Sequence, residues 1–347
     1  MKRKNLLNKV EGLTDNFMFS YSRFSLLYGL KELGFTNKDV VLVPDYNCDV
    51  IYYPLRQLGL ELHYYSLKDN FTPDWESVRK NIKSSTRAIM MVHYFGQPQP
   101  IDEFIRFAHE YKLLLIEDNA HGHSGSYKGK LLGTFGDIGF GSPRKQLNLE
   151  YGATLYIQGN QIFSPVKRLS KMHVTSFKIE LLKAIPRIRI LRFFFKKYIL
   201  SKPNFVRPEY FLEDEISDVL PDRYASNRIK NTDWKVIGEQ RRESWNQWTD
   251  FCKKRGLTPI WDQPDPSSCP WIMPAYAANE KTRTMLLNAS WEAGLGLLPW
   301  PSLPKYVLDH CPEAMRRWKL LVCFPLNKMP NEHRSEIRSF DEIISRL

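Results

Sequence analysis

Residues 113–153 contain the feature that most constrains what this chain can fold into. A short apolar run is followed by two acids and by a glycine-rich loop that ends in a serine and a lysine. The run at 113–116 is typical of a buried strand, although periodicity alone leaves a buried helical segment open. Glu117 and Asp118 follow it directly. Ligands of open α/β sheets bind beyond the carboxyl ends of the strands, so we expect Asp118 to border a pocket.

The loop after Asp118 carries residue types that suit one cofactor. Its glycines allow the backbone to approach a ligand closely, and His121, Ser142 and Lys145 lie in it or at its end. Pyridoxal 5'-phosphate (PLP) needs a carboxylate to keep its ring nitrogen protonated and a lysine for a Schiff base. An aspartate and a lysine at this separation are common, so their spacing alone does not establish the cofactor.

The string at residues 116–137, IEDNAHGHSGSYKGKLLGTFGD, is more specific. It resembles the signature of the DegT/DnrJ/EryC1/StrS family of PLP-dependent sugar aminotransferases, which have the aspartate aminotransferase fold, fold type I. The resemblance implies an α/β fold: a mostly parallel, seven-stranded-type sheet flanked by helices, with a smaller α+β C-terminal domain. It covers residues 18–157 well and residues 222–347 loosely.

The resemblance also implies roles for individual residues. Lys145 would form the Schiff base with PLP and then move the proton between the amino donor and the cofactor. Asp118 would keep the ring nitrogen protonated, and His121 would contact the hydroxyl side of the ring. The resemblance further implies that Ala120 leaves room for the ring and that Ser22, Arg23 and Ser142 bind the phosphate. It also implies a side chain that stacks on the ring; Tyr46 is the first candidate, and Asn47 and Cys48 stay open.

Plainer interpretations stay open for several of these residues. A capped helix with a surface arginine explains Ser22 and Arg23, and a buried core aromatic explains Tyr46. His93 matches a V-H-x-x-G stretch of the family, but we interpret it as a hydrogen-bonded core histidine.

Around Lys145 the chain departs from the common family pattern. The usual serine stands five residues before the lysine, and E-G-G follows; here Ser142 stands three residues before, and Glu150-Tyr151-Gly152 follows. The S-P-R-K form resembles a branch of the family with S-x-R-K. The surrounding glycines and proline argue against a solvated loop lysine, so Lys145 remains the predicted Schiff-base residue.

Short apolar runs alternate with amphipathic segments in the first half of the chain, which predicts βαβ units and a mostly parallel sheet. We expect strands at 40–43, 60–66, 88–94, 113–116 and 153–157, and helices at 17–34, 50–58, 72–82 and 101–111. Later we expect a long helix at 223–255, strands at 269–277 and 319–325, and helices at 279–294 and 331–346. The predicted domains are a large PLP-binding domain, residues 1–221 with a basic helical insertion at 160–215, and a connecting helix with a small domain, residues 222–347.

The positive charge of the chain is local. The formal net charge is +12, and residues 165–207 hold twelve lysines and arginines against one acid, Glu180. The rest of the chain is therefore near neutral, which argues against nucleic-acid binding as a property of the fold. A basic amphipathic segment can lie on an anionic membrane surface, but we favour an insertion that packs on its own protein or on a dimer partner.

The cysteines and the N-terminus favour a cytoplasmic location. The five cysteines are odd in number and have no C-x-x-C or Cys/His ligand spacing, which argues against a disulfide framework or a metal site. The N-terminus is basic but lacks the apolar segment of a signal peptide, and no apolar run is long enough to span a membrane.

The resemblance implies an aminotransferase that moves an amino group from an amino acid, usually glutamate, to a keto sugar, commonly nucleotide-linked. Such enzymes act in cell-surface polysaccharide or related biosynthesis, and the resemblance implies a homodimer with a shared active site. Two alternatives stay open. Some relatives are sugar dehydratases with His in place of the lysine, which Lys145 argues against. A degenerate protein with a binding or scaffolding role would not need Asp118, His121, Ser142 and Lys145 together.

Overall fold

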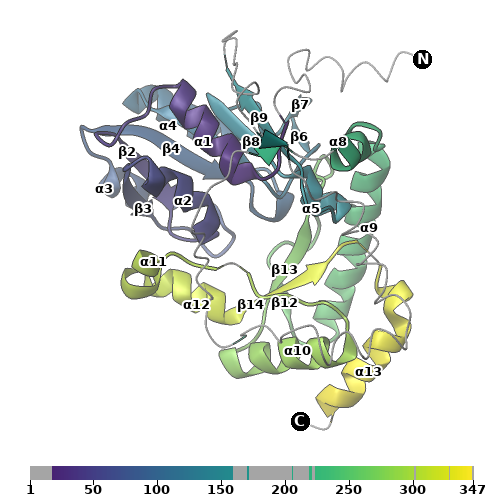
Figure 1. Cartoon of the computed structure of the whole chain (residues 1–347). Coiled ribbons are helices and arrows are strands. Elements are labelled where there is room, and N and C mark those ends of the chain that lie inside the picture. Colours follow the sequence, from purple (N-terminus) through teal and green to yellow (C-terminus); the bar gives the residue numbers. More distant parts are fainter. Residues whose placement is uncertain are drawn as a thin grey trace.

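The structure, a computed structural model, describes residues 18–158, 170–171, 205, 219–220, 223–300, 302–327 and 329–345. Its larger sheet has seven strands in the order β1-β9-β8-β5-β4-β2-β3. These strands are β1 (Met18–Phe19), β2 (Val40–Pro44), β3 (Glu61–Tyr65), β4 (Thr86–Val92), β5 (Leu114–Asn119), β8 (Ile138–Gly141) and β9 (Ala153–Ile157). The predicted α/β class with a mostly parallel sheet flanked by helices is confirmed (Figure 1).

The direction of the strands places the site. β3, β2, β4, β5 and β8 run parallel, whereas β9 is antiparallel to both β8 and β1. Every residue of β2 is buried, as expected for a parallel strand covered on both faces. From β2 the chain continues to β3 on one side of that strand and then to β4 on the other side, so the order of the strands reverses at β2. The carboxyl ends of β2, β4 and β5 therefore open a crevice of the kind that holds ligands.

The first helix begins later than the sequence predicts. The helices of this half are α1 (Ser22–Glu32), α2 (Asp49–Gln57), α3 (Trp75–Asn81), α4 (Ile101–Tyr111) and α5 (Pro143–Leu147), with a short 3-10 turn η2 (Tyr94–Gly96). The predicted helix at 17–34 is wrong at its start, because Met18 and Phe19 pair with β9 as an edge strand. Tyr21 is still extended, and the helix begins only after it.

The C-terminal part forms a second, antiparallel sheet with helices beside it (Figure 1). Its strands are β12 (Thr258–Pro259), β13 (Ile272–Tyr276) and β14 (Leu321–Pro325), and its helices are α10 (Glu280–Ala293), α11 (Lys305–His310), α12 (Pro312–Leu320), the 3-10 turn η5 (Pro330–His333) and α13 (Arg334–Ser345). Two further strand pairs are β6 (Ser126–Tyr127) with β7 (Lys130–Leu131), and β10 (Ser170–Lys171) with β11 (Val219–Leu220).

The single helix predicted at 223–255 is wrong, because the structure has two helices there. These are α8 (Arg223–Lys230) and α9 (Trp234–Lys253). The Asp233 carboxylate accepts the backbone N–H groups of Lys235 and Val236 at 3.1 and 3.3 Å, which caps a new helix. In Figure 1, α9 runs along one side from the level of the large sheet to that of the small sheet.

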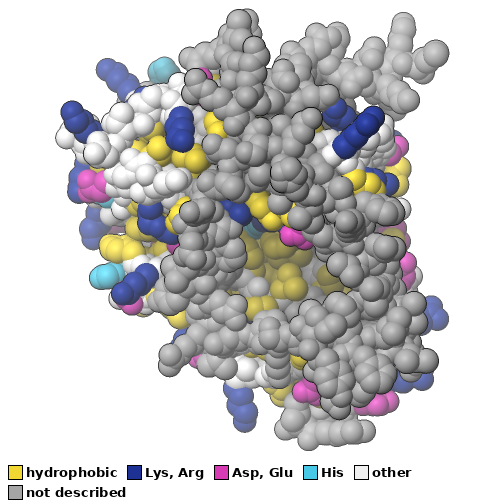
Figure 2. All heavy atoms as spheres, in the orientation of Figure 1, with side chains coloured by type: hydrophobic (Ala, Val, Ile, Leu, Met, Phe, Trp, Pro, Cys, Tyr) yellow, Lys and Arg dark blue, Asp and Glu magenta, His cyan; other side chains and the backbone are white. Residues whose placement is uncertain are grey.

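The two sheets share contacts close to the predicted site. Trp271, just before β13, donates its backbone N–H to the carbonyl of Phe95 in η2 at 3.2 Å. Figure 2 shows hydrophobic side chains set back at the centre of the face that it presents. The boundary between residues 221 and 222 stays a prediction.

Apart from residues 170–171 and 205, the basic segment at 165–207 and the rest of the predicted insertion at 160–215 lie outside the described residues. Its predicted helical character therefore stays a prediction. Within the described part of the chain, no helix is both long enough and apolar enough to cross a membrane.

Glu117, fully buried on β5, anchors the loop that precedes β8. Its carboxylate accepts the backbone N–H groups of Gly133 and Phe135 at 2.6 Å and that of Gly136 at 2.9 Å. His93 Nε2 lies 2.8 Å from the same carboxylate. Burial alone raises the pKa of Glu117, but these hydrogen bonds and the charge of His93 outweigh it, so the net pKa lies below the usual value.

We expect Glu117→Gln to lower the free energy of unfolding by about 2–3 kcal/mol, because an amide presents N–H groups to backbone N–H groups in a buried site. Urea unfolding at neutral pH measures this loss. Because the folded-state pKa is lowered, the stabilisation by Glu117 is present above its unfolded-state pKa and disappears as the pH falls. Glu110→Gln, an exposed control on α4, should change the stability by less than about 0.5 kcal/mol. Equal losses in the two variants would refute the anchoring role.

Candidate active site

Lys145 lies in the short helix that follows β8. Ser142 is the N-cap residue, Pro143 occupies the first helical position, and the backbone N–H of Lys145 donates to the carbonyl of Ser142 at 2.9 Å. The Lys145 ammonium lies 4.4 Å from the centroid of the Trp271 ring. Burial and then the charge of Arg144 lower the pKa of Lys145 to about 8. A lysine with this pKa exchanges protons readily near neutral pH.

Asp118 lies at the carboxyl end of β5, and its side chain is buried. One carboxylate oxygen accepts the backbone N–H of Ala120 at 2.9 Å, and the other accepts the side-chain amide of Asn47 at 3.3 Å. Burial raises the pKa of Asp118, and the Ala120 N–H, the Lys145 charge and the Asn47 amide oppose this rise. A buried carboxylate of this kind is a fitting partner for a protonated ring nitrogen.

His121 is buried beside Lys145 in the neutral form. Its Nδ1 accepts the backbone N–H of Phe95 at 3.2 Å, which leaves the proton of a neutral ring on Nε2. Burial and the charge of Lys145 hold the pKa of His121 well below its usual value. The side chain therefore offers an N–H donor without a positive charge.

The residues predicted to bind phosphate lie at the starts of α1 and α5. Ser22 and Arg23 begin α1, where backbone N–H groups lack intrahelical partners, and the Arg23 guanidinium lies over the Tyr21 ring at 4.1 Å. The Arg144 guanidinium lies near the same ring at 5.0 Å. The two helix starts therefore share one cationic corner.

Buried polar atoms without a hydrogen-bond partner among the described residues occur in this corner. They include the hydroxyl oxygen of Ser142 and Nε of Arg144. Buried polar groups are normally hydrogen-bonded, so these atoms indicate a polar ligand. Phosphate, which accepts hydrogen bonds and carries negative charge, fits this donor set.

Tyr46 is fully buried among aromatic side chains. Its hydroxyl donates to the carbonyl of Trp300 at 2.8 Å, and its ring contacts Phe71 and Trp300. Asn47 instead bonds to Asp118, and Cys48 interacts electrostatically with Lys145. Stacking of Tyr46 on a cofactor ring stays a prediction, and the contacts of its neighbours favour the alternatives Asn47 and Cys48.

Two tryptophans from the C-terminal part complete the site. The His121 ring lies 4.7 Å from the Trp271 ring and 5.0 Å from the Trp300 ring, measured between centroids. Gly96 allows this approach: its φ is +91°, and a Cβ there would lie 2.6 Å from the His121 carbonyl and 2.7 Å from Pro270. Trp271 could not be placed from sequence, because its contact with Lys145 depends on how the two sheets are joined.

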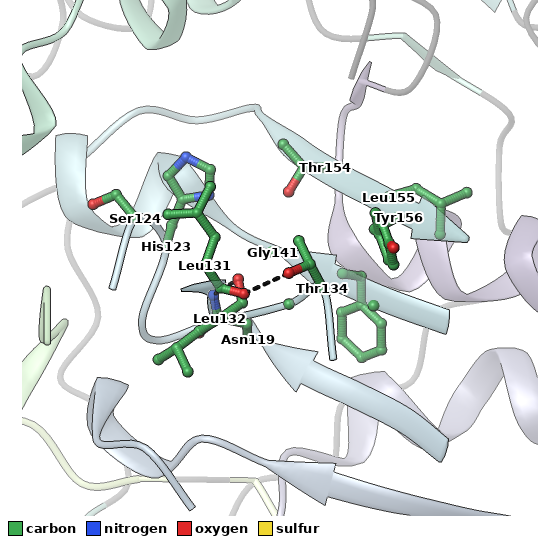
Figure 3. Close-up of a pocket in the computed structure, with 13 residues that line it drawn as sticks. Asn119, His123, Ser124, Leu131, Leu132, Thr134, Gly141, Thr154, Leu155 and Tyr156 are labelled. Carbon is green, nitrogen blue, oxygen red and sulfur yellow. Dashed lines mark hydrogen bonds between the residues drawn. The ribbon is translucent and has the colours of Figure 1, made fainter. Parts of the chain in front are cut away.

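A separate cavity of about 150 Å³ lies near the same strands. Figure 3 shows the residues that line it. Asn119, the residue after Asp118, lines it together with His123 and Thr154. Successive strand residues point to opposite faces, so Asp118 and Asn119 serve different sides of the sheet. The cavity is therefore not the pocket predicted at Asp118.

The described residues hold no cluster of three or more His, Cys, Asp or Glu side chains that would bind a metal ion. All five cysteines are free. The site instead combines a buried carboxylate, a lysine with a lowered pKa, a neutral histidine and an anion-binding corner, which together fit PLP.

Comparisons with known proteins agree with this chemistry. Residues 24–152 match the model of the DegT/DnrJ/EryC1/StrS aminotransferase family, the family that the sequence resembles. GDP-4-keto-6-deoxy-D-mannose 3-dehydratase of Escherichia coli O55:H7 is 31% identical over 35% of this chain and 33% of its own length. GDP-perosamine synthase of Vibrio cholerae is 25% identical over 80% of this chain and 79% of its own length.

Among solved structures, E coli GDP-4-keto-6-deoxy-D-mannose-3-dehydratase with bound hydrated PLP has a TM-score of 0.63 to this chain at 18% identity. The superposition covers 93% of this chain and 86% of that structure. This likeness confirms the predicted fold type I. The sequence match to the E. coli O55:H7 relative, by contrast, spans about a third of that relative's length.

Proposed function

We propose that this member of the DegT/DnrJ/EryC1/StrS family is a PLP-dependent aminotransferase. It would move an amino group from an amino acid, glutamate first, to a keto sugar linked to a nucleotide, in cell-surface polysaccharide or related biosynthesis. The observation that carries the proposal is the meeting of Lys145, Asp118 and neutral His121 at the carboxyl edge of one sheet. A protein without turnover would need none of these three groups together.

Each residue of the site has a distinct task in this reaction. PLP, when bound, supplies an electron sink for the negative charge that develops on the donor carbon. Lys145 takes a proton at Nζ and returns it on the other side of the transfer. Asp118 holds a proton on the ring nitrogen, and His121 donates its Nε2–H to an oxygen of the ring or substrate. Trp271 and Trp300 keep water away from the reacting atoms.

The cofactor phosphate would bind at the cationic corner. The hydroxyls of Ser22 and Ser142, the guanidinium of Arg23 and the first amides of α1 supply donors there. Ala120 is buried beside Asp118 and has a small side chain, which leaves room for a flat ring.

The proposed class of acceptor is inferred from the similar proteins. GDP-perosamine synthase of Vibrio cholerae matches four fifths of this chain, and its name gives a nucleotide-linked amino sugar. This supports a nucleotide-linked keto sugar as the acceptor. A homodimer with a shared active site, a cytoplasmic location and peripheral membrane contact through residues 165–207 stay predictions, and we do not predict nucleic-acid binding.

Dehydration is the second candidate, because E. coli relatives carry that activity in their names. The family's dehydratases have a histidine where Lys145 stands. A lysine can take part in amino transfer, so the residue at position 145 favours the aminotransferase over the dehydratase.

The amino-transfer half-reaction tests the proposal without knowledge of the acceptor. Purified protein with PLP and glutamate, but no acceptor, should form about one molecule of 2-oxoglutarate per chain and lose the visible absorption of bound PLP. Bound PLP with no 2-oxo acid formed from any amino acid would argue against amino transfer. No PLP binding at all would favour the scaffolding role.

The pH dependence of the rate follows from the environment of Lys145. Only the neutral amine takes a proton, and its pKa is lowered to about 8, so kcat should rise with pH and level off above about pH 8. Because the charge of Arg144 contributes to this lowering, Arg144→Gln should move the midpoint to higher pH. Rate measurements across the pH range check both statements, and a rate that falls as the pH rises toward 8 would contradict them.

A further inference from the structure

Arg241 on α9 joins the helix of Lys145 to the strand of Trp271. Its guanidinium donates to the backbone carbonyl of Gln146, the residue after Lys145. It also donates to the carbonyl of Trp271 at 2.8 Å and to that of Pro270 at 3.2 Å. The side chain is 4% exposed. One buried group therefore holds both the helix that carries Lys145 and the ring that covers it.

Gln146 extends the same connection to His121. Its side-chain amide donates to the His121 carbonyl at 2.8 Å and to the Cys269 carbonyl at 3.4 Å. The three segments that supply Lys145, His121 and Trp271 therefore meet at Gln146 and Arg241. Trp271 is far in sequence from both His121 and Lys145, so the chain itself does not fix its position relative to them.

We propose that Arg241 is a positioning residue for Lys145, which it holds beneath Trp271 by bridging the α5 and Trp271 carbonyls. The inference rests on the proposed function for its catalytic meaning, because Lys145 is the group that moves the proton. In the described part of the chain the hydrogen bonds of Arg241 go to backbone carbonyls, so it acts through Lys145 and Trp271.

Arginine suits this task for a geometric reason. Its planar guanidinium presents donors in a fixed fork, whereas a lysine ammonium is one compact donor centre at the end of a flexible chain. Burial lowers the pKa of Arg241 to about 10, which still leaves it charged at neutral pH. Lysine at this position would keep the charge but could not hold all three carbonyls in the same arrangement.

Loosening this bridge should change the surroundings of Lys145. The pKa of Lys145 is lowered to about 8 mainly by burial, so movement of α5 away from Trp271 lets water reach the amine. Its pKa should then rise toward the ordinary lysine value. A change of about 1 Å in position can also lower the rate of the chemical step by on the order of 100-fold.

The test compares Arg241→Lys with Arg242→Lys in the full chain. Arg242 is the neighbouring residue on α9 and donates to a single carbonyl, that of Ser268, at 2.5 Å. After removal of bound cofactor, trace acetylation of Lys145 is measured against pH by peptide mass spectrometry, with exposed Lys130 as the internal reference. The midpoint of the rise in the Lys145 acetylation rate with pH should lie near pH 8 in the wild type and in Arg242→Lys. In Arg241→Lys it should lie at least about one pH unit higher.

Kinetics of the loaded enzyme give the second readout. Arg241→Lys should lower kcat at least about tenfold with less than about a threefold change in the donor KM. A wild-type midpoint in Arg241→Lys would overturn the proposal, as would equal shifts in both variants. If Arg241→Lys does not fold, Arg241→Gln, which keeps a single amide donor group, decides: a raised midpoint supports the bridge, and an unchanged one overturns it. Because acetylation needs no turnover, a normal wild-type midpoint without amino transfer would refute the proposed function alone.

Discussion

Lys145→Ala is expected to lower the rate of amino transfer by on the order of 10³-fold. The variant loses the amine that takes and returns the proton, and general acid–base groups contribute roughly 10²- to 10⁴-fold to enzymatic rates. The measurement is a single turnover with glutamate, followed as 2-oxoglutarate. The cationic corner at the starts of α1 and α5 does not depend on the Lys145 amine, so the variant should still bind PLP, without a covalent link.

Lys128→Ala is the matched control for this substitution. Lys128 is exposed and pairs with Asp102 at 2.7 Å on the surface. Surface pairs of this kind contribute little, so the control should retain the wild-type rate within about twofold. A Lys145→Ala variant that retains a tenth or more of the wild-type rate would show that another group moves the proton.

Asp118→Asn is expected to lower the rate by on the order of 10²- to 10³-fold, the effect of removing one preorganised electrostatic group. Asparagine is nearly the same size and can still accept the Ala120 N–H, so the fold should be retained. Its amide is neutral and cannot stabilise a protonated ring nitrogen, so the electron sink weakens. Single-turnover rates and the absorption spectrum of bound PLP measure this loss.

Asp137→Asn provides the control for Asp118. Asp137 accepts the backbone N–H of Leu115 at 2.8 Å, at the opposite end of β5 from Asp118. The Asp137 carboxylate contacts the end of β5 that is remote from the crevice. Its replacement should therefore leave the spectrum of bound PLP unchanged. Equal losses of activity in the two variants would point to a general weakening of β5 and not to a role of Asp118 in the chemistry.

The alternation of short apolar runs with amphipathic segments predicted most of the main sheet, but not β1 or β8. Its strands are short and apolar, and β2, β4, β5 and β9 lie close to the predicted ranges. The errors occurred where tertiary contacts decide. Met18 and Phe19 became an edge strand because β9 was available to pair with them. The break before α9 depends on the Asp233 side chain acting as a cap, which the apolar pattern does not reveal.

The site shows the same division between local and distant information. Asp118, His121, Ser142 and Lys145 lie within one segment, so a motif could identify them. In the structure Lys145 interacts electrostatically with both Asp118 and His121. Trp271 and Arg241 come from distant parts of the chain. Their contribution depends on the packing of β13 and α9 against the large sheet, which no local pattern encodes. Tyr46 shows the converse: its hydroxyl donates to the carbonyl of distant Trp300, and the next residue, Asn47, bonds to Asp118.

The most direct test of the central claim is to locate the lysine that binds PLP. The purified chain is loaded with PLP, reduced with borohydride to fix the cofactor, digested and mapped by mass spectrometry. We predict a phosphopyridoxyl group on Lys145 and its loss in Lys145→Ala, with Lys128 and Lys130 unmodified. A stoichiometric modification at a different lysine, or no modification after loading, would contradict the assignment of Lys145 and the aminotransferase built on it.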